Sequence, residues 1–335
     1  MEKKKIELYH RRILVTGGLG FIGSNFLNMF VPVMKKTLFI NMDAKKHGSN
    51  EENIKVRDHE NYIQLRDWES EITDIFHIVN VFEKYVPTDI IHFAAETHVD
   101  RSIESSATFV KTNVLGTENL LKVFVANNCQ VNGKFLHVST DEVYGDTDRP
   151  ERQWKETSEM NPRNIYSATK ASAEHIVRAY GNVYGFEPCI TRAGNNYGPN
   201  QDDSKLIPKM IKRALEGKSI KIYGDGTNFR QWTHVEDHCD ALGRVLFGRK
   251  TGGTWNIAGD DILSNNTVIS HILTASGSSS GIVYVDDRQA HDKGYSIDCS
   301  KIKQQLLWNP SRDFIAGIYS LIEEYRTKQQ KKDVV

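Results

Sequence analysis

Short runs rich in β-branched residues alternate with longer segments of helical periodicity from Arg12 to about residue 194, and this alternation restricts the fold more than any other feature. Such an order predicts a parallel sheet whose strands are joined by crossover helices. Nearly every position of these runs is apolar, as expected of strands that helices cover on both faces. Six such strands suffice for a doubly wound sheet of the α/β class, and they span residues 12–17, 37–43, 62–67, 89–95, 135–140 and 188–194.

The segments between these runs have the spacing of amphipathic helices. In residues 71–85, apolar side chains recur at intervals of three and four, which places them on one face of a helix. We expect the buried face to carry Ile72, Ile75, Phe76, Val79 and Phe82. Residues 107–127 and 167–184 show a similar pattern and are also predicted to be helical.

The composition excludes several classes of protein. Of the 335 residues, 43 are Lys or Arg and 43 are Asp or Glu, so no net charge attracts nucleic acid or a membrane surface. No apolar run approaches the ~20 residues of a membrane-spanning helix, and residues 1–12 lack the features of a secretory signal. The four cysteines are too scattered for a metal site or a disulfide framework, which favours a reducing, cytoplasmic location.

A glycine-rich turn over residues 16–23 joins the first predicted strand to an apolar helix. Its glycines permit dihedral angles that other residues avoid, and they let the backbone approach a pyrophosphate, which the helix N-terminus also attracts. This context predicts a Rossmann-type nucleotide site formed by Gly17, Gly20, Phe21, Ile22 and Gly23.

Asp43 ends the second predicted strand, twenty residues beyond Gly23. A carboxylate at this point can bind the ribose 2′-hydroxyl and repels a 2′-phosphate, which favours NAD over NADP. The nearby cations Lys45 and Lys46 leave a 2′-phosphate as the alternative.

The pattern loosens after about Thr191, where clusters of glycine, asparagine and proline separate short elements. We therefore expect two domains. The first is an NAD-binding Rossmann domain of residues 1–190, to which residues 230–262 return; the second is a smaller α/β substrate-binding domain of residues 191–330.

Tyr166 and Lys170 are spaced i and i+4, so both side chains lie on one face of a predicted helix. A lysine cation beside a tyrosine hydroxyl lowers the pKa of the phenol, which makes Tyr166 a candidate proton acceptor near neutral pH. The alternative is a solvated helix face, because this spacing is common.

The segment Thr140-Asp141-Glu142 follows the fifth predicted strand. In a parallel sheet, ligands bind beyond the carboxyl ends of the strands, where this segment should lie. Two adjacent carboxylates there can divide acid and base roles if their environments separate their pKa values. The alternative is a polar turn with a capping aspartate.

Together, these motifs resemble the extended short-chain dehydrogenase/reductase superfamily, and within it the nucleotide-sugar 4,6-dehydratases. The resemblance extends from about Arg12 to Trp308. The Thr-Asp-Glu triplet is the most discriminating part, because epimerases of the superfamily lack the acid pair. The segments that carry the resemblance are residues 16–23, 94–103, 112–117, 139–145, 166–170, 194–199 and 223–232.

The resemblance implies an activity on dTDP-glucose or UDP-glucose. Tyr166 would deprotonate the hydroxyl at sugar carbon 4 while hydride leaves that carbon for NAD, assisted by Lys170 and Thr140. Glu142 would remove the proton from carbon 5, and protonated Asp141 would donate to the hydroxyl that leaves carbon 6. Asp141 then needs a raised pKa, which burial and a neighbouring carboxylate would both produce.

The resemblance also implies further binding residues. For the cofactor these are Tyr166, Lys170, Asp67, Ala94, Ala95, Asn113 and Asn196. For the substrate they are Thr97, Asn195, Lys205, Leu206, Lys221, Tyr223, Arg230, Asn265, Arg288, His291 and Tyr295. The chain departs from the family pattern in Arg66-Asp67-Trp68, in Ala290 and in Gly294, where the family usually has a basic residue.

Two other activities and one non-catalytic function remain possible at this point. A UDP-glucuronate decarboxylase also begins with oxidation at carbon 4, but it expels no water and so has no need of a protonated Asp141. An epimerase has no use for two carboxylates, and a non-catalytic NAD-binding scaffold would not need them. As partners we expect the nucleotide sugar and a second copy of the chain, paired through the helices after Ala107 and Tyr166; no metal is implied.

Overall fold

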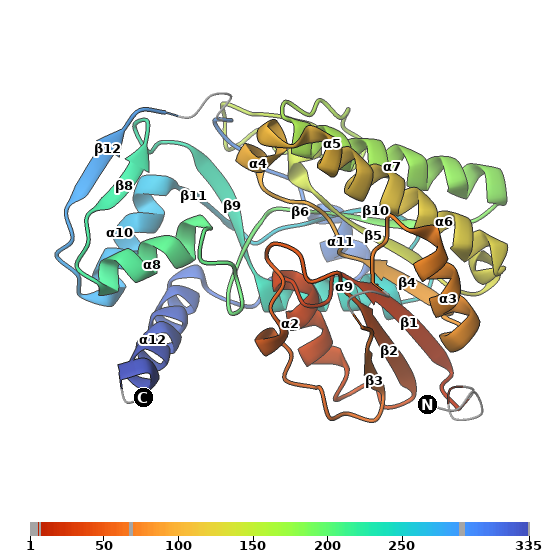
Figure 1. The fold of residues 1–335 in the computed structure, drawn as a ribbon. Helices are drawn as coiled ribbons and strands as arrows, with labels where there is room; N and C mark the ends of the chain where they lie inside the picture. Colours follow the sequence, from red (N-terminus) through yellow and green to blue (C-terminus); the bar gives the residue numbers. More distant parts are fainter. Residues whose placement is uncertain (1–5, 7, 67–69, 288–291, 334–335) are drawn as a thin grey trace.

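The computed structural model describes residues 6, 8–66, 70–287 and 292–333. Its centre is a parallel sheet of seven strands in the order β10-β6-β5-β4-β1-β2-β3 (Figure 1). This confirms the doubly wound α/β fold. The strands are β1 (Arg11–Thr16), β2 (Thr37–Met42), β3 (Tyr62–Gln64), β4 (Asp89–His92), β5 (Phe135–Thr140), β6 (Cys189–Ala193) and β10 (Gly253–Ile257).

The seventh strand, β10, was not among the six runs expected from the sequence. It pairs in parallel with β6 and extends the sheet beyond it. Its sequence, Gly-Thr-Trp-Asn-Ile, lacks the continuous apolar run of the other strands, so only pairing with β6 identifies it. It follows α9 (Val235–Phe247), which packs against α2 (Phe21–Phe30).

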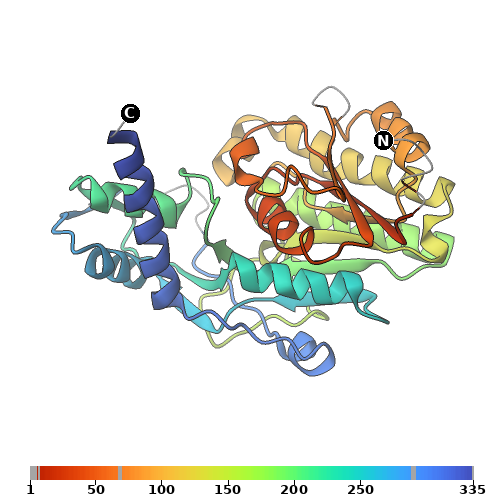
Figure 2. The ribbon, with the colours of Figure 1, turned by 90° about the horizontal axis from the view of Figure 1, so that it is seen from below.

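Successive strand residues face opposite sides of the sheet, and each side is covered by helices. Ile13 and Val15 of β1 pack with α2 and α9, whereas Leu14 packs with the helices of the other face. Those helices are α3 (Ile75–Tyr85), α6 (Gly116–Ala126) and α7 (Ile165–Tyr184). Figure 2 shows α9, in turquoise, beside α2, in red. All strands of the sheet therefore end at one edge, between two layers of helices.

The predicted buried face of α3 is partly wrong. The helix begins only at Ile75, after the cap Asp74, so Ile72 lies before it. Phe76 is 73% exposed. The predicted stripe includes Ile72, which lies outside the helix, so its phase differs from that of the buried face. The buried side chains of the helix are Ile78, Val81, Phe82 and Tyr85.

The predicted helix over residues 107–127 is divided by a π-helical segment. This stretch of the chain consists of α5 (Ser106–Phe109), the π-helix η3 (Val110–Leu115) and α6. The short helix α4 (Val99–Glu104) precedes it. The wider π turn buries Thr112 and Asn113. Such segments are often found at functional sites.

A smaller lobe lies beside the carboxyl edge of the sheet, on the left in Figure 1. Its three-stranded sheet contains β7 (Asn195–Tyr197), β9 (Phe229–His234) and β11 (Asp261–Ser264), and its two-stranded sheet contains β8 (Ile220–Tyr223) and β12 (Ile282–Val285). The lobe has its own core, which includes Tyr197, Trp232 and Phe314. Its helices are α8 (Leu206–Leu215), α10 (Asn265–Ser276) and α12 (Phe314–Asp333).

The remaining short elements are α11 (Ser300–Gln305) and the 3-10 helices η1 (Glu51–Asn53), η4 (Cys129–Val131) and η5 (Asp141–Tyr144). Within the described parts of the chain, none of the helices has both the length and the apolar character required to cross a membrane.

Candidate active site

The glycine turn after β1 is closely packed on one side and open on the other. Gly17 has φ of +74°, and a Cβ there would lie 2.6 Å from the backbone nitrogen of Ala94. At Gly23 a Cβ would lie 2.5 Å from the Gly17 carbonyl oxygen. At Gly20 a Cβ would meet one atom within 4 Å, the Gly17 carbonyl oxygen at 3.3 Å, and its other sides face the pocket that the residue lines. The turn therefore leaves a free path along Gly20, as a pyrophosphate requires.

Helix α2 starts at this open side. Its N-cap, Gly20, provides no side-chain hydrogen bond to the first turn, and Phe21 and Ile22 line the pocket. The free N–H groups and the helix dipole favour an anion there.

Asp43 lies at the end of β2, buried against the pocket. Its carboxylate accepts hydrogen bonds from the backbone of Leu19 and Lys45 and from the Ser49 hydroxyl, each at 2.8 Å. A fixed, buried carboxylate suits a ribose and disfavours a 2′-phosphate.

The two cations that left NADP as an alternative have acidic partners. Lys45 pairs with Glu51, and Lys46 pairs with Glu71. The open glycine turn, the uncapped helix and Asp43 together fit a dinucleotide such as NAD.

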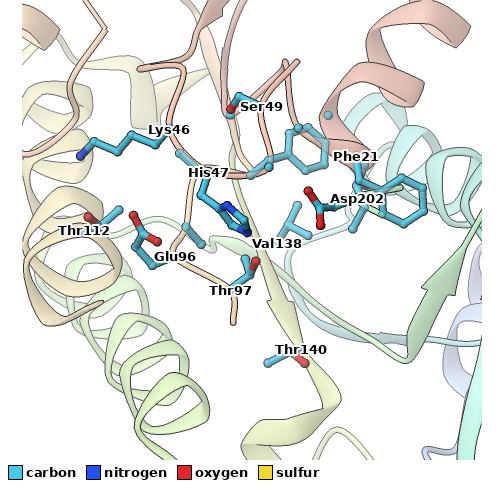
Figure 3. A pocket seen from close by; sticks show the side chains of 18 of the residues that line it. Phe21, Lys46, His47, Ser49, Glu96, Thr97, Thr112, Val138, Thr140 and Asp202 are labelled. Carbon is cyan, nitrogen blue, oxygen red and sulfur yellow. The ribbon is translucent and has the colours of Figure 1, made fainter. Parts of the chain in front are cut away.

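The pocket continues past Ala94 and Ala95 to the carboxyl ends of β4, β5 and β6 (Figure 3). In this view Lys46 and Glu96 lie on the left, Phe21 and Asp202 on the right, Thr97 between them, and Thr140 at the bottom. The pocket brings together most of the predicted site residues: Gly17, Gly20, Phe21, Ile22, Gly23, Asp43, Ala94, Ala95, Thr97, Thr140, Asp141, Glu142, Tyr166, Lys170, Asn195, Asn196 and Lys205.

Other predicted residues lie outside this pocket. Asp67, Arg288 and His291 fall outside the described residues. Asn113 is buried behind the pocket, where its side chain hydrogen bonds to both backbone groups of Glu96 and to Thr169. The predicted substrate residues that do not line the pocket are Leu206, Lys221, Tyr223, Arg230, Asn265 and Tyr295.

The acid pair lies where β5 ends. Thr140 caps the short helix η5, because its hydroxyl accepts a hydrogen bond from the Glu142 N–H at 3.3 Å. Asp141 is buried, and its Oδ2 has no hydrogen-bond partner in the described structure. Burial, with a smaller contribution from Glu142, raises the pKa of Asp141 to about 8. The structure thus agrees with the raised pKa expected of an acid that is protonated near neutral pH.

Glu142 has a separate set of contacts. Its pKa is raised by burial, while a hydrogen bond from the Asn164 side chain, 3.2 Å from Oε2, opposes that shift. Asn164 also caps α7 through a reciprocal pair of hydrogen bonds with Ser167. One residue thus connects the acid pair to the helix that carries Tyr166 and Lys170.

The electrostatic expectation for Tyr166 is wrong for the protein alone. Burial is the largest effect and raises the pKa of Tyr166 above its usual value, with a further contribution from Glu142. The Lys170 ammonium donates to the Val138 carbonyl oxygen at 2.7 Å, and burial lowers the pKa of Lys170 to about 8. The i, i+4 spacing correctly predicted that Tyr166 and Lys170 lie together in the pocket. Burial, however, raises the pKa of Tyr166, whereas the sequence predicted that Lys170 would lower it.

Three residues that the sequence did not single out belong to this site. Glu96 is buried, lines the pocket and pairs with Arg101 at 3.5 Å. Its position next to Thr97, just beyond the fourth predicted strand, is the sequence feature that could have indicated it. Asn164 is the N-cap of the helix that carries Tyr166. His238 fixes Asn196 through a 2.9 Å hydrogen bond that no local pattern indicates.

The fold and the site define an extended short-chain dehydrogenase/reductase: a doubly wound sheet with a dinucleotide turn, a Tyr/Lys pair on one helix and a second lobe over the pocket. A family model described as GDP-mannose 4,6 dehydratase matches residues 14–321, and the chain belongs to that family.

Similar proteins agree with this assignment. The dTDP-glucose 4,6-dehydratase of Salmonella typhimurium is 38% identical over 341 residues, which cover 95% of this chain and 94% of that protein. The dTDP-glucose 4,6-dehydratase of Bacillus anthracis, solved in complex with NAD, has a TM-score of 0.86 at 37% identity and covers 96% of this chain and 98% of its own. DesIV, the dTDP-glucose 4,6-dehydratase of Streptomyces venezuelae, solved with NAD and the ligand TYD bound, has a TM-score of 0.88 at 36% identity. The match covers 95% of this chain and 98% of DesIV.

Proposed function

We propose that this protein is an NAD-dependent hydro-lyase that converts a nucleoside-diphosphate glucose into the 4-keto-6-deoxy sugar and water. The observation that carries the proposal is the buried carboxyl of Asp141, whose Oδ2 has no hydrogen-bond partner in the described structure and which lines the same pocket as Tyr166 and Glu142. A protonated acid is needed only where hydroxide must leave. This favours dehydration over decarboxylation and epimerisation.

In this proposal the chain supplies three proton-transfer groups. Tyr166 removes the hydroxyl proton at carbon 4, and the resulting ketone acidifies carbon 5. Glu142 takes the carbon 5 proton and later returns one to it, while Asp141 protonates the hydroxyl that leaves carbon 6 as water. Thr140, which forms a hydrogen bond that lowers the pKa of Tyr166, also contacts the carbon 4 oxygen.

Gly17, Gly20, Gly23 and Asp43 hold the cofactor in this proposal. The chemistry that NAD supplies when bound is reversible hydride transfer, from carbon 4 and back to carbon 6, and its oxidised ring carries a positive charge that favours the Tyr166 phenolate.

We assign the nucleotide as dTDP first and UDP second. The named relatives are dTDP-glucose 4,6-dehydratases. Thymine and uracil differ by one methyl group, which is worth only about 1–3 kcal/mol in discrimination.

The test is a side-by-side measurement of kcat/KM with dTDP-glucose, UDP-glucose and UDP-glucuronate. Formation of a 4-keto-6-deoxy sugar from either glucose nucleotide supports the proposal. Release of carbon dioxide from UDP-glucuronate with no dehydration contradicts it, as does tightly bound NAD with no turnover of any of the three.

We further propose the division into a cofactor domain of residues 1–190, with 230–262 returning, and a substrate domain of residues 191–330. Its support is that α9 and β10, within residues 230–262, join the helices and the strands of the large sheet. At the two ends of that range, β9 and β11 pair in the three-stranded sheet of the smaller lobe. Because all four cysteines are separate thiols, we also propose a reducing, cytoplasmic location.

We propose a homodimer through η3, α6 and α7. These elements expose apolar side chains to solvent: Val110 is 50% exposed, Leu115 39%, Val183 74% and Tyr184 49%. Two copies of this surface would pair isologously. Leu115→Asp should then convert a dimer into a monomer in sedimentation at micromolar concentration, and a wild-type monomer would contradict the proposal.

A further inference from the structure

Arg163 connects the smaller lobe to the start of α7. Its guanidinium lies 3.0 Å from the carboxylate of Asp146, in the loop after η5, and 3.7 Å from that of Asp292. The side chain of Asp292 is 6% exposed, whereas that of Arg163 is 55% exposed. One half-exposed cation thus bridges a buried carboxylate of the smaller lobe and a loop beside the acid pair.

Two hydrogen bonds of backbone N–H groups also join the loop after η5 to the segment 292–295. The Gly294 N–H donates to Asp146 Oδ1 at 2.9 Å, and the Thr147 N–H donates to the Gly294 carbonyl oxygen at 3.0 Å. A Cβ at position 294 would lie 2.1 Å from the Phe229 ring. The glycine that departs from the family pattern therefore lets the segment 292–295 pass between Phe229 and Asp146.

Asp292 also contacts Arg230, both through Tyr295 and through its own carbonyl oxygen. Its carboxylate accepts a hydrogen bond from the Tyr295 hydroxyl, and the Arg230 guanidinium stacks 4.8 Å from the centre of the Tyr295 ring. Arg230 also donates to the carbonyl oxygens of Phe229 at 2.7 Å and of Asp292 at 3.2 Å. The position of Arg230 therefore depends on where the segment 292–295 is held.

Asn164, the residue after Arg163, contacts the acid pair through Glu142. Asn164 donates to Glu142, and the positive charge of Arg230 is close enough to lower the pKa of both Asp141 and Glu142. Two adjacent residues at the start of α7 thus restrain the acid pair on one side and the supports of Arg230 on the other.

We propose that Arg163 and Asp292 are positioning residues that set the distance between Arg230 and the acid pair. A guanidinium suits the diphosphate of a nucleotide sugar, so this distance decides whether the bound sugar presents carbons 5 and 6 to Glu142 and Asp141. The inference rests on the proposed function.

The first test compares Arg163→Met, which keeps the aliphatic stem, with the control Arg149→Met. The Arg149 side chain is 76% exposed and pairs with an equally exposed Asp148. We expect Arg163→Met to raise both the KM for dTDP-glucose and the Kd for dTDP about fivefold, with bound NAD unchanged. Asp292→Asn should have at least that effect, and the double variant should resemble the stronger single variant, because coupled residues are not additive.

The second test reads the contact without any turnover. Hydrogen–deuterium exchange of the NAD-loaded protein should be faster in the peptides covering residues 145–148 and 292–297 in Arg163→Met, and unchanged in Arg149→Met. Unchanged exchange overturns the inference. Faster exchange with unchanged KM and Kd also overturns it, because the contact would then be structural only. A wild-type protein that turns over no nucleotide sugar would refute the proposed function instead, and the exchange comparison would still decide whether Arg163 holds the segment.

Discussion

The side-chain amide of Asn164 donates a hydrogen bond to Glu142 Oε2 at 3.2 Å, and the same side chain caps the helix that carries Tyr166 and Lys170. The group proposed to take the carbon 5 proton and the group proposed to take the hydroxyl proton therefore share one rigid support. Substitutions at these positions should interrupt different steps of the reaction, which makes the steps separable.

Asp141→Asn should still oxidise carbon 4 but stall before water is lost, because an amide cannot deliver a proton to the leaving hydroxyl. We expect bound NADH to accumulate and kcat to fall about 10²–10⁴-fold. Rapid-mixing absorbance of the NAD-loaded variant measures this. Normal dehydration by this variant would contradict the acid role and reopen the decarboxylase alternative.

Tyr166→Phe should block the first step, because no group is left to take the proton from the carbon 4 hydroxyl. We expect no NADH absorbance after mixing with substrate when the variant and the wild type are compared at equal measured content of bound NAD. An NADH signal as fast as in the wild type would assign the proton transfer to another group.

Glu142→Gln should form NADH but fail to exchange the carbon 5 proton, because an amide is not a base. The measurement is deuterium incorporation at carbon 5 in heavy water, read by mass spectrometry of the recovered sugar. We expect a decrease of about 10²–10⁴-fold in the exchange rate. Exchange at the wild-type rate would exclude Glu142 as the base.

Gly20→Val should abolish NAD binding, because the side chain would extend into the open path of the pyrophosphate. Gly281→Val is the matched control, since a Cβ there meets nothing within 4 Å. Absorbance of cofactor released from the purified proteins gives the NAD content. Equal content in the two variants, or a preference for NADPH in titrations of the wild type, would contradict the assigned cofactor site.

The raised pKa of Asp141 also predicts how stability depends on pH. Since the folded-state pKa of about 8 exceeds the ordinary value, the neutral form is favoured in the fold. Stability from this group is therefore fully present below the unfolded pKa of about 4 and is lost as pH rises towards 8.

Asp141→Asn should remove this loss, so its Tm should exceed that of the wild type by at least about 2 °C at pH 7.5, with a smaller difference at pH 5. The activity of the wild type should fall above about pH 8, as the acid loses its proton. Asp148→Asn, at a side chain 76% exposed, is the control. An Asp141→Asn gain that does not vary with pH would refute the raised pKa.

Local features of the sequence were sufficient for much of this site. The glycine turn at residues 16–23, the spacing of Tyr166 and Lys170, and the triplet after β5 each depend on neighbouring residues, and the structure places all of them in one pocket. The apolar runs also predicted six of the seven strands of the large sheet. A strand that is buried on both faces is apolar at nearly every position, and this pattern can be recognised within the run itself.

What only the tertiary structure decided depends on residues far apart in the chain. Burial raises the pKa of Tyr166, whereas the sequence predicted that Lys170 would lower it. Burial also raises the pKa of Asp141, as the sequence predicted. The pairing of β10 with β6 and the bridge from Arg163 to Asp292 join segments that no local pattern connects. Desolvation and long-range contacts arise from packing, so the chemistry of each side chain could be expected from the sequence, whereas its environment came only from the fold.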